Sequence, residues 1–116
     1  MEEPSFVTYE ELQILHAKSL KKYGGSEGIR DQGLIESALG AAQNTFFYAQ
    51  GDLFDIAASY AFHIAQAQAF LDGNKRTAIS AALTFLKMNL YDAMIAIAEK
   101  RLDKTGLAEL FRKIFQ

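Results

Sequence analysis

The residues of this 116-residue chain that could carry chemistry gather in one short stretch, numbered 70–77. The stretch precedes a strongly helical run, so its residues should lie at the start of a helix. There, unpaired backbone N–H groups and the positive end of the helix dipole attract anions. Its polar members are an acid, a glycine, an amide and two cations in direct succession: Asp72, Gly73, Asn74, Lys75 and Arg76.

Each of these residue types suits a metal-bound polyphosphate. Gly73 lets the backbone approach a phosphate because it has no Cβ. Lys75 and Arg76 supply positive charge, and a guanidinium can hold two oxygens at once. Asp72 is a hard oxygen ligand suited to the Mg²⁺ that accompanies ATP, and Asn74 can donate to a phosphate oxygen. The alternative is an ordinary turn followed by solvated cations. Two cations at the positive end of a helix dipole favour a bound anion instead.

Composition limits the classes of protein to consider. The length predicts a single domain spanning residues 1–116, and the balance of 50% apolar and 22% charged residues predicts a folded chain. A net charge of −2 gives no support for direct nucleic-acid or membrane-surface binding, and the lack of cysteine excludes disulfides and thiolate metal sites. Neither a signal peptide nor an uncharged membrane-spanning run is recognisable. We therefore expect a cytoplasmic protein that does not enter a membrane.

Helix signals divide the N-terminal half of the chain. Thr8 and Glu11 have the spacing of a capping box, which predicts a helix that runs to about Tyr23. The glycine pair after Tyr23 should end it. Asp31 is a plausible cap for a second helix that runs through Leu39.

Three further segments complete the expected fold. Residues 43–52 lack helical periodicity and predict a loop rich in aromatic residues. A long helix is expected from Leu53 to Ala69, then a break at residues 72–73 and another helix over 74–88. Shorter helices are expected over 92–101 and 105–115. These segments predict an all-α fold, a compact bundle of about six helices, with a central helix–loop–helix that carries the phosphate-binding loop.

The same stretch resembles the motif of the Fic/Doc family, His-x-Phe-x-(Asp/Glu)-Gly-Asn-Lys-Arg. Three more blocks are similar to Doc (death on curing) toxins, the short branch of that family, at residues 23–31, 33–39 and 81–86. Several ordered blocks at family spacing make a chance match improbable. The resemblance implies an all-α fold and a toxin of a toxin–antitoxin system, paired with a Phd-like antitoxin whose C-terminal segment folds into a groove on the toxin.

The resemblance also implies roles for individual residues. Asp72 would hold Mg²⁺, and Gly73, Asn74, Lys75 and Arg76 would bind the phosphates of ATP. Phe70 would be a buried anchor of the loop. The segment of residues 44–50 corresponds to a flap that aligns the target, with Asn44, Thr45, Phe46 and Phe47 as its positioning residues.

Two positions distinguish the branches of the family. The motif of family members that transfer AMP resembles Gly-Asn-Gly-Arg-x-x-Arg at this point. In this chain Lys75 stands at the position of its second glycine, and Ile79 at the position of its second arginine. In Doc-like members this pattern accompanies phosphate transfer by a kinase reaction. The implied target is a threonine of elongation factor Tu, whose modification stops translation. Transfer of AMP is the alternative.

Gln68 occupies the position of the family's catalytic histidine, beside Asp72, Lys75 and Arg76 of the implied catalytic set. An amide does not titrate near neutral pH and cannot act as a base, so catalysis should be impaired. Neither His16 nor His63 is placed near the loop by the sequence. Gln68 is either an introduced change that lets a toxic protein be produced or a natural loss of catalysis, and the intact neighbouring residues favour the first. A non-catalytic module that binds nucleotide or antitoxin is the remaining alternative.

Overall fold

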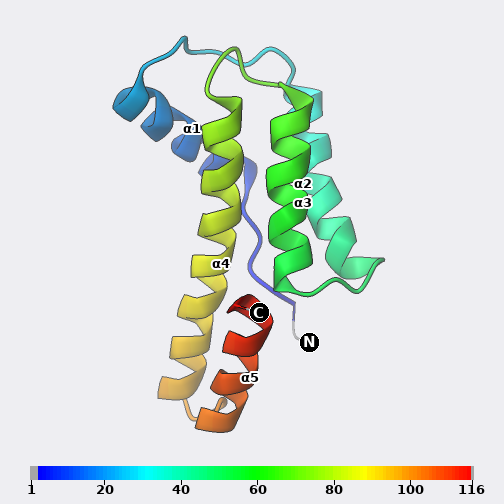
Figure 1. Ribbon diagram of the computed structural model, residues 1–116, viewed down its shortest axis with the longest axis vertical. Coiled ribbons are helices and arrows are strands. Elements are labelled where there is room, and N and C mark those ends of the chain that lie inside the picture. The colour runs from blue at the N-terminus through cyan, green and yellow to red at the C-terminus, as the bar shows by residue number, and fades with distance from the viewer. Residues whose placement is uncertain (1–2, 116) are drawn as a thin grey trace.

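The computed structural model describes residues 3–115, which form an all-α fold of five helices (Figure 1). The central pair, α3 and α4, is an antiparallel hairpin, with α2 packed on α3 and α1 packed on α4. The last helix turns back beneath the start of α3. The helices are α1 (Tyr9–Tyr23), α2 (Gln32–Phe47), α3 (Leu53–Ala67), α4 (Asn74–Ala98) and α5 (Lys104–Phe115).

The predicted helix starts are confirmed by side-chain caps. The Thr8 hydroxyl accepts from the backbone N–H of Glu11, and the Glu11 carboxylate accepts from the backbone N–H of Thr8, which completes the capping box of α1. Asp31 caps α2 by accepting from the backbone N–H of Leu34. Asp52 caps α3 in the same way, so each of these three helices begins where a short polar side chain satisfies its first N–H groups.

Two expected boundaries are wrong. The helix α2 continues to Phe47, so the loop predicted from residue 43 begins only at Tyr48. Within that last turn the Thr45 hydroxyl donates to the carbonyl of Ala41, and Phe46 packs against the core. The helices expected over 74–88 and 92–101 are one helix of 25 residues, because no glycine or proline interrupts residues 74–98. The described chain therefore has five helices where about six were expected.

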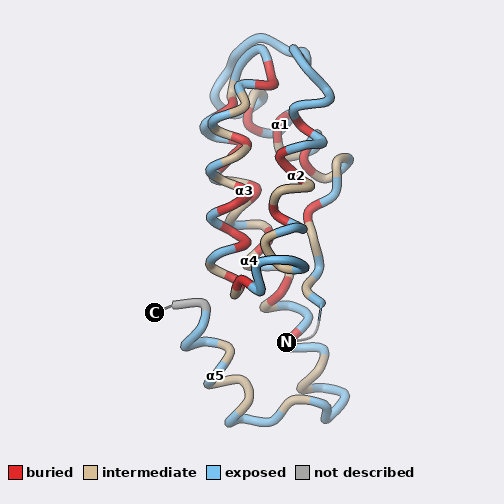
Figure 2. The backbone as a smooth tube through the Cα atoms, turned by 90° about the vertical axis from the view of Figure 1, so that its right-hand side faces the viewer, coloured by how far each residue is buried: buried red, intermediate tan, exposed pale blue. Residues whose placement is uncertain are grey.

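Burial concentrates where the first three helices meet the N-terminal half of α4 (Figure 2). The largest side chains with no more than 1% exposure include Tyr60, Phe70 and Phe85, one from α3, one from the loop after it and one from α4. By length and composition α4 could cross a membrane, but the core helix of a helical bundle passes the same test. It packs on α3 and α1, but only 28% of its most apolar stretch is buried, and Ile79 and Leu83 are exposed.

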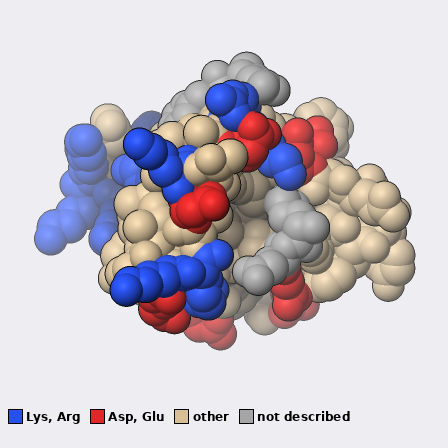
Figure 3. All heavy atoms as spheres, turned by 90° about the horizontal axis from the view of Figure 1, so that it is seen from below, with Lys and Arg blue, Asp and Glu red and all other residues tan. Residues whose placement is uncertain are grey.

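The opposite end of the molecule is more loosely built. The C-terminal half of α4 and the whole of α5 extend below the bundle, so the molecule measures 46 × 31 × 23 Å. Seen from this end, cations and anions stand side by side (Figure 3). Two ion pairs belong to this part of the chain, Arg101–Glu99 and Arg112–Glu109. A groove of about 510 Å³ separates α5 from α4 there. It lies at the far end of α4 from the polar loop.

Candidate functional site

The polar loop, residues 68–73, closes the top of the α3–α4 hairpin (Figure 1). Asn74, the first residue of α4, holds this loop in shape. The Asn74 side-chain oxygen accepts from the backbone N–H of Phe70 at 3.0 Å, and its amide donates to the Phe70 carbonyl, also at 3.0 Å. Asn74 is only 8% exposed. Both polar atoms of the side chain therefore hold the loop, which leaves one amide hydrogen without a partner among these bonds.

The loop is also held by the segment that joins α1 to α2. Ile29 and Phe70 form an antiparallel bridge pair. The backbone N–H of Arg30 donates to the Ala69 carbonyl at 2.6 Å, and that of Leu71 donates to the Gly28 carbonyl at 3.1 Å. Phe70 is 1% exposed, which confirms its predicted burial. Residues far apart in the sequence thus fix the conformation of the loop on both sides of Phe70.

Gly25 lets this segment approach Asp72. The Asp72 carboxylate accepts from the backbone N–H of Ser26 at 3.2 Å and from that of Gly73 at 3.0 Å. A Cβ on Gly25 would lie 2.9 Å from the same carboxylate, and the φ of +124° at Gly25 is one that L side chains rarely adopt. The sequence predicted Gly24 and Gly25 as a helix end only, and it did not predict the close approach of Gly25 to Asp72.

The start of α4 differs from the other helix starts. Gly73 precedes it at a φ of +76°, and no side chain caps the first N–H groups of the helix. The other described helices all have a side-chain acceptor at this position, since Asp103 accepts from Gly106 at the start of α5. Uncapped N–H groups at the positive end of a 25-residue helix would attract an anion.

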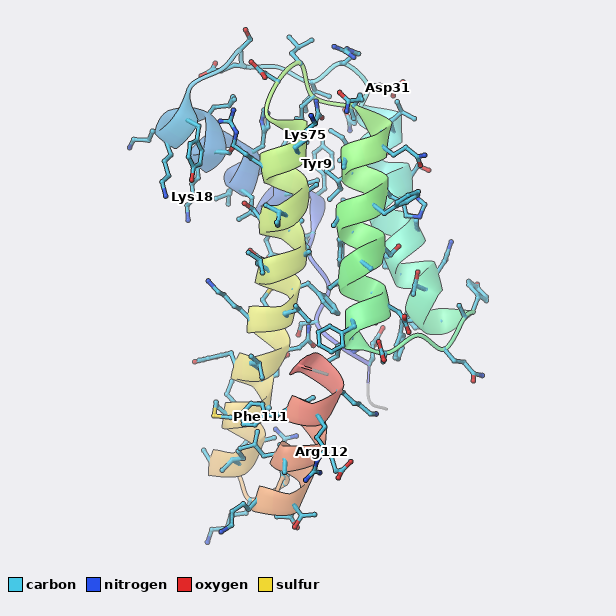
Figure 4. The ribbon with its side chains drawn as sticks, viewed as in Figure 1. Tyr9, Lys18, Asp31, Lys75, Phe111 and Arg112 are labelled. Atoms are coloured by element: carbon cyan, nitrogen blue, oxygen red, sulfur yellow. The ribbon has the colours of Figure 1, made fainter. Side chains whose placement is uncertain are left out.

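Lys75 and Arg76 lie in the first turn of α4, and both are exposed. Figure 4 places Lys75 at the top of α4, beside the loop. The Arg76 guanidinium lies 4.8 Å from the ring centre of Tyr23, the last residue of α1. A cation stacked on an aromatic face keeps its charge while losing side-chain freedom. The structure thus brings two cations to the uncapped helix start, as the sequence predicted.

Gln68 ends α3 in a left-handed conformation, with φ 53° and ψ 39°. Its side-chain amide donates to the Ala65 carbonyl at 2.9 Å, and its own carbonyl accepts from the guanidinium of Arg30 at 3.4 Å. The side chain is exposed. Its remaining polar atom is an amide oxygen, which can accept a hydrogen bond from a hydroxyl but cannot take up its proton near neutral pH.

His16 is a neighbour of the loop that sequence reasoning missed. From the middle of α1, its Nε2 lies 2.8 Å from the Asp72 carbonyl oxygen, and its ring stacks on Phe70 with centroids 3.9 Å apart. One signal was available, since His16 follows the buried Leu12 by four residues and so shares its helix face. His63 instead makes an edge contact with Phe62 on α3.

The four residues predicted to form the flap lie in the last turn of α2 instead of a loop. Phe47 is 51% exposed and Tyr48, the residue after the helix, is 84% exposed. Phe46 and Phe47 both contact the ring of Phe6 near the N-terminus. Because Asn44, Thr45, Phe46 and Phe47 are helical, a backbone pairing by this segment would have to come from residues 48–52.

Asp72 is the one predicted metal ligand, and the described residues contain no cluster of three or more acids, histidines or cysteines that could hold a metal unaided. This arrangement fits Mg²⁺ better than a resident transition metal, because Mg²⁺ is commonly held by one or two carboxylates together with substrate phosphates. The carboxylate stands next to an uncapped helix start, so a single acid can share a metal with a bound polyphosphate.

Behind the loop lies a half-open cleft of about 660 Å³ between α1 and residues 25–29. His16 and Phe70 form part of its wall, while Gln68, Lys75 and Arg76 do not line it. The cations of the candidate site therefore lie outside this cleft, on exposed surface.

Comparison with known proteins gives consistent matches. Residues 6–86 match the Fic/DOC family. The chain is 32% identical over 119 residues to "Protein kinase doc" of Escherichia phage P1, a match that covers 94% of each chain. It is also 42% identical over 78 residues to "Toxin Doc" of Mycolicibacterium smegmatis, which covers 66% of this chain and 59% of that protein.

Proposed function

The chain belongs to the Fic/DOC family, and we propose that it is a Doc-like toxin built to transfer phosphate from ATP–Mg²⁺ to a protein. The observation that carries this proposal is the uncapped start of α4, beside Asp72 and preceded by Gly73. The N–H groups there, with Lys75 and Arg76, would bind the phosphates, and Asp72 would hold Mg²⁺. Bound Mg²⁺ would neutralise charge that develops on the transferred phosphate.

Transfer of phosphate is favoured over transfer of AMP by the residues around the helix start. Lys75 places an ammonium group in the first turn, at the position where the motif of AMP-transferring family members has a glycine. Ile79 stands one turn further along, is 59% exposed and offers no second guanidinium for the terminal phosphates. A nucleotide bound with its γ-phosphate toward the protein target would need fewer cations at that second position.

The protein target that we propose is a threonine of elongation factor Tu, and the inhibitor is a Phd-like antitoxin encoded as a separate chain. Both would act in the cytoplasm. The resemblance to Doc toxins and the names of the two relatives support this assignment. The open surface around Lys75 and Arg76 is compatible with a folded protein as the substrate, since both cations are exposed.

Gln68 separates binding from catalysis in this proposal. Its amide is held at the end of α3 and supplies no base, so transfer should be slower by about 10²–10⁴-fold than with histidine. This observation also favours a second candidate function, a non-catalytic module that binds nucleotide or antitoxin. Phosphate transfer depends strongly on positioning and charge, so residual activity remains compatible with the first candidate.

The test restores histidine with Gln68→His and follows label from γ-labelled ATP into elongation factor Tu, with α-labelled ATP in a parallel reaction. We expect γ-label alone to be transferred, and faster than by the parent chain. The matched control is Gln66→His, an exposed position two residues earlier on α3, which should not raise transfer. Transfer of α-label would indicate an AMP transferase, and no transfer by a folded variant that binds ATP would favour the binding module.

A further inference from the structure

His16 connects the middle of α1 to the candidate site 56 residues away. A carbonyl oxygen only accepts hydrogen bonds, so the His16 Nε2 must carry the hydrogen in its 2.8 Å contact with Asp72. The ring is nearly parallel to that of Phe70, with 15° between the planes. His16 is 7% exposed, so neither contact competes freely with water. The side chain therefore makes two separable contacts, one through its nitrogen and one through its ring.

The nitrogen contact fixes the peptide bond between Asp72 and Gly73. In a trans peptide the C=O and N–H groups point to opposite sides, so holding the carbonyl toward α1 directs the Gly73 N–H away from it. That N–H points to the Asp72 carboxylate, at 3.0 Å. Gly73 has a φ of +76°, and glycine tolerates either orientation of the preceding peptide at little steric cost. Without a partner on its carbonyl, this peptide could rotate.

A rotated peptide would change the charge presented at the helix start. The Asp72 carbonyl oxygen would then point toward the side where a phosphate would bind, and the partial negative charge of that oxygen would oppose an anion. The N–H of Gly73 would also leave the Asp72 carboxylate. The hydrogen bond from His16 to the Asp72 carbonyl would thus determine whether this carbonyl oxygen points away from a bound phosphate or toward it.

We infer that His16 is a positioning residue that fixes the Asp72–Gly73 peptide for binding of ATP–Mg²⁺, an inference that rests on the proposed function. His16 itself would not touch the nucleotide, because its Nε2 is occupied by the Asp72 carbonyl and its ring by Phe70. A positioning role makes nucleotide affinity depend on the hydrogen bond of His16. A purely structural role would make it depend on the packing of the ring, and three substitutions separate these possibilities.

In His16→Phe the ring stays and the donor is lost, whereas in His16→Gln an amide donor replaces the ring. His63→Phe is the matched control, since His63 contacts Phe62 and has no contact with the loop among the described interactions. Affinity for ATP would be measured by calorimetry with and without Mg²⁺, and folding by thermal melting. We expect His16→Phe to weaken ATP–Mg²⁺ binding about tenfold, the effect of losing one hydrogen bond, with little change in melting temperature. His16→Gln should retain most of the affinity, and His63→Phe all of it.

A second readout does not depend on nucleotide. The carbonyl carbon resonance of Asp72 reports whether its oxygen accepts a hydrogen bond, and it should move upfield in His16→Phe but stay in place in His16→Gln and His63→Phe. If the parent chain binds no ATP, the proposed function fails, and this resonance still decides whether His16 fixes the peptide. An unmoved resonance in His16→Phe would overturn the inference, as would an equal loss of affinity in His16→Phe and His16→Gln.

Discussion

Asn74 and Phe70 are joined by two hydrogen bonds in opposite directions, side chain to backbone N–H and side chain to backbone carbonyl. This pair closes the loop between α3 and α4 before the helix begins. It assigns to Asn74 a structural task where the sequence suggested a contact with phosphate. The family motif thus contains at least one residue that shapes the site in addition to residues that would meet a ligand.

Replacing Asn74 should therefore affect folding directly. Asn74→Ala leaves the buried N–H and carbonyl of Phe70 without partners, and we expect a loss of about 2–3 kcal/mol in the free energy of unfolding. Asn44→Ala is the control, an exposed asparagine in the last turn of α2, which should change stability by less than about 0.5 kcal/mol. Urea denaturation measures both. Equal effects at the two positions would contradict the role given to the Asn74–Phe70 pair.

The close approach of Gly25 to Asp72 predicts a coupled effect of Gly25→Ala. The φ of +124° is strained for alanine, and the new Cβ would push on the carboxylate. We expect a loss of about 1–3 kcal/mol in stability, together with weaker Mg²⁺-dependent binding of ATP. Gly40→Ala provides the comparison, because a Cβ there meets nothing within 4 Å inside α2. It should be neutral or stabilising by up to about 1 kcal/mol. A Gly25→Ala variant with parental stability and binding would refute this account of the loop.

The two cations of the first turn should contribute to affinity for ATP. Lys75→Ala and Arg76→Ala should each weaken binding by about 3- to 30-fold, since charge-assisted hydrogen bonds are lost but both side chains are exposed to screening water. Arg76→Lys keeps the charge and loses the planar stack on Tyr23, so its effect should be smaller than that of Arg76→Ala. The control is Lys87→Ala, an exposed lysine on the same helix beyond its first turn. Titration calorimetry at two salt concentrations would show whether the losses are electrostatic.

Tyr60 predicts how stability depends on alkaline pH. Its hydroxyl accepts from the backbone N–H of Val7, and burial raises its pKa from 10.0 to about 12. The folded state therefore favours the neutral phenol. This preference contributes at most about 2–3 kcal/mol to the free energy of unfolding. The contribution is complete below pH 10 and is lost as pH rises from 10 to about 12.

Tyr60→Phe removes this titration, so its free energy of unfolding should fall less steeply than that of the parent between pH 10 and 12. The variant should also be less stable at neutral pH, because the buried N–H of Val7 loses its acceptor. Chemical denaturation at a series of pH values measures both effects. Parallel curves for parent and variant would show that Tyr60 does not titrate differently in the folded and unfolded chain.

Much of the fold could be predicted because its signals are local. Thr8, Asp31 and Asp52 are capping residues whose chemistry acts within three positions of the chain, and each marks a helix start in the structure. Helix ends were harder to place. Residues 43–47 have no clear periodicity, yet contacts of Phe46 with the core and with Phe6 extend α2 over them.

The site was predictable as a list of residues but not as an arrangement. The run from Asp72 to Arg76 is contiguous, so the sequence alone brought its members together. The contacts of His16 and Gly25 with that run cross nearly half of the chain, and no periodicity or spacing encodes them. Likewise, only the structure shows that Asn74 is occupied by Phe70 and that Gln68 is turned back onto α3.

The central claim is that the loop before α4 binds ATP–Mg²⁺ even though Gln68 replaces a base. Calorimetric titration of the unmodified chain with ATP, in Mg²⁺ and in chelator, tests it most directly when repeated on Asp72→Asn and Asp92→Asn. Asp92 lies on the same helix and accepts from Ser5, away from the loop. We predict that ATP binds and that Mg²⁺ strengthens binding in the parent and in Asp92→Asn, but not in Asp72→Asn. Absence of ATP binding by the folded parent, or a Mg²⁺ effect that persists in Asp72→Asn, would contradict the account.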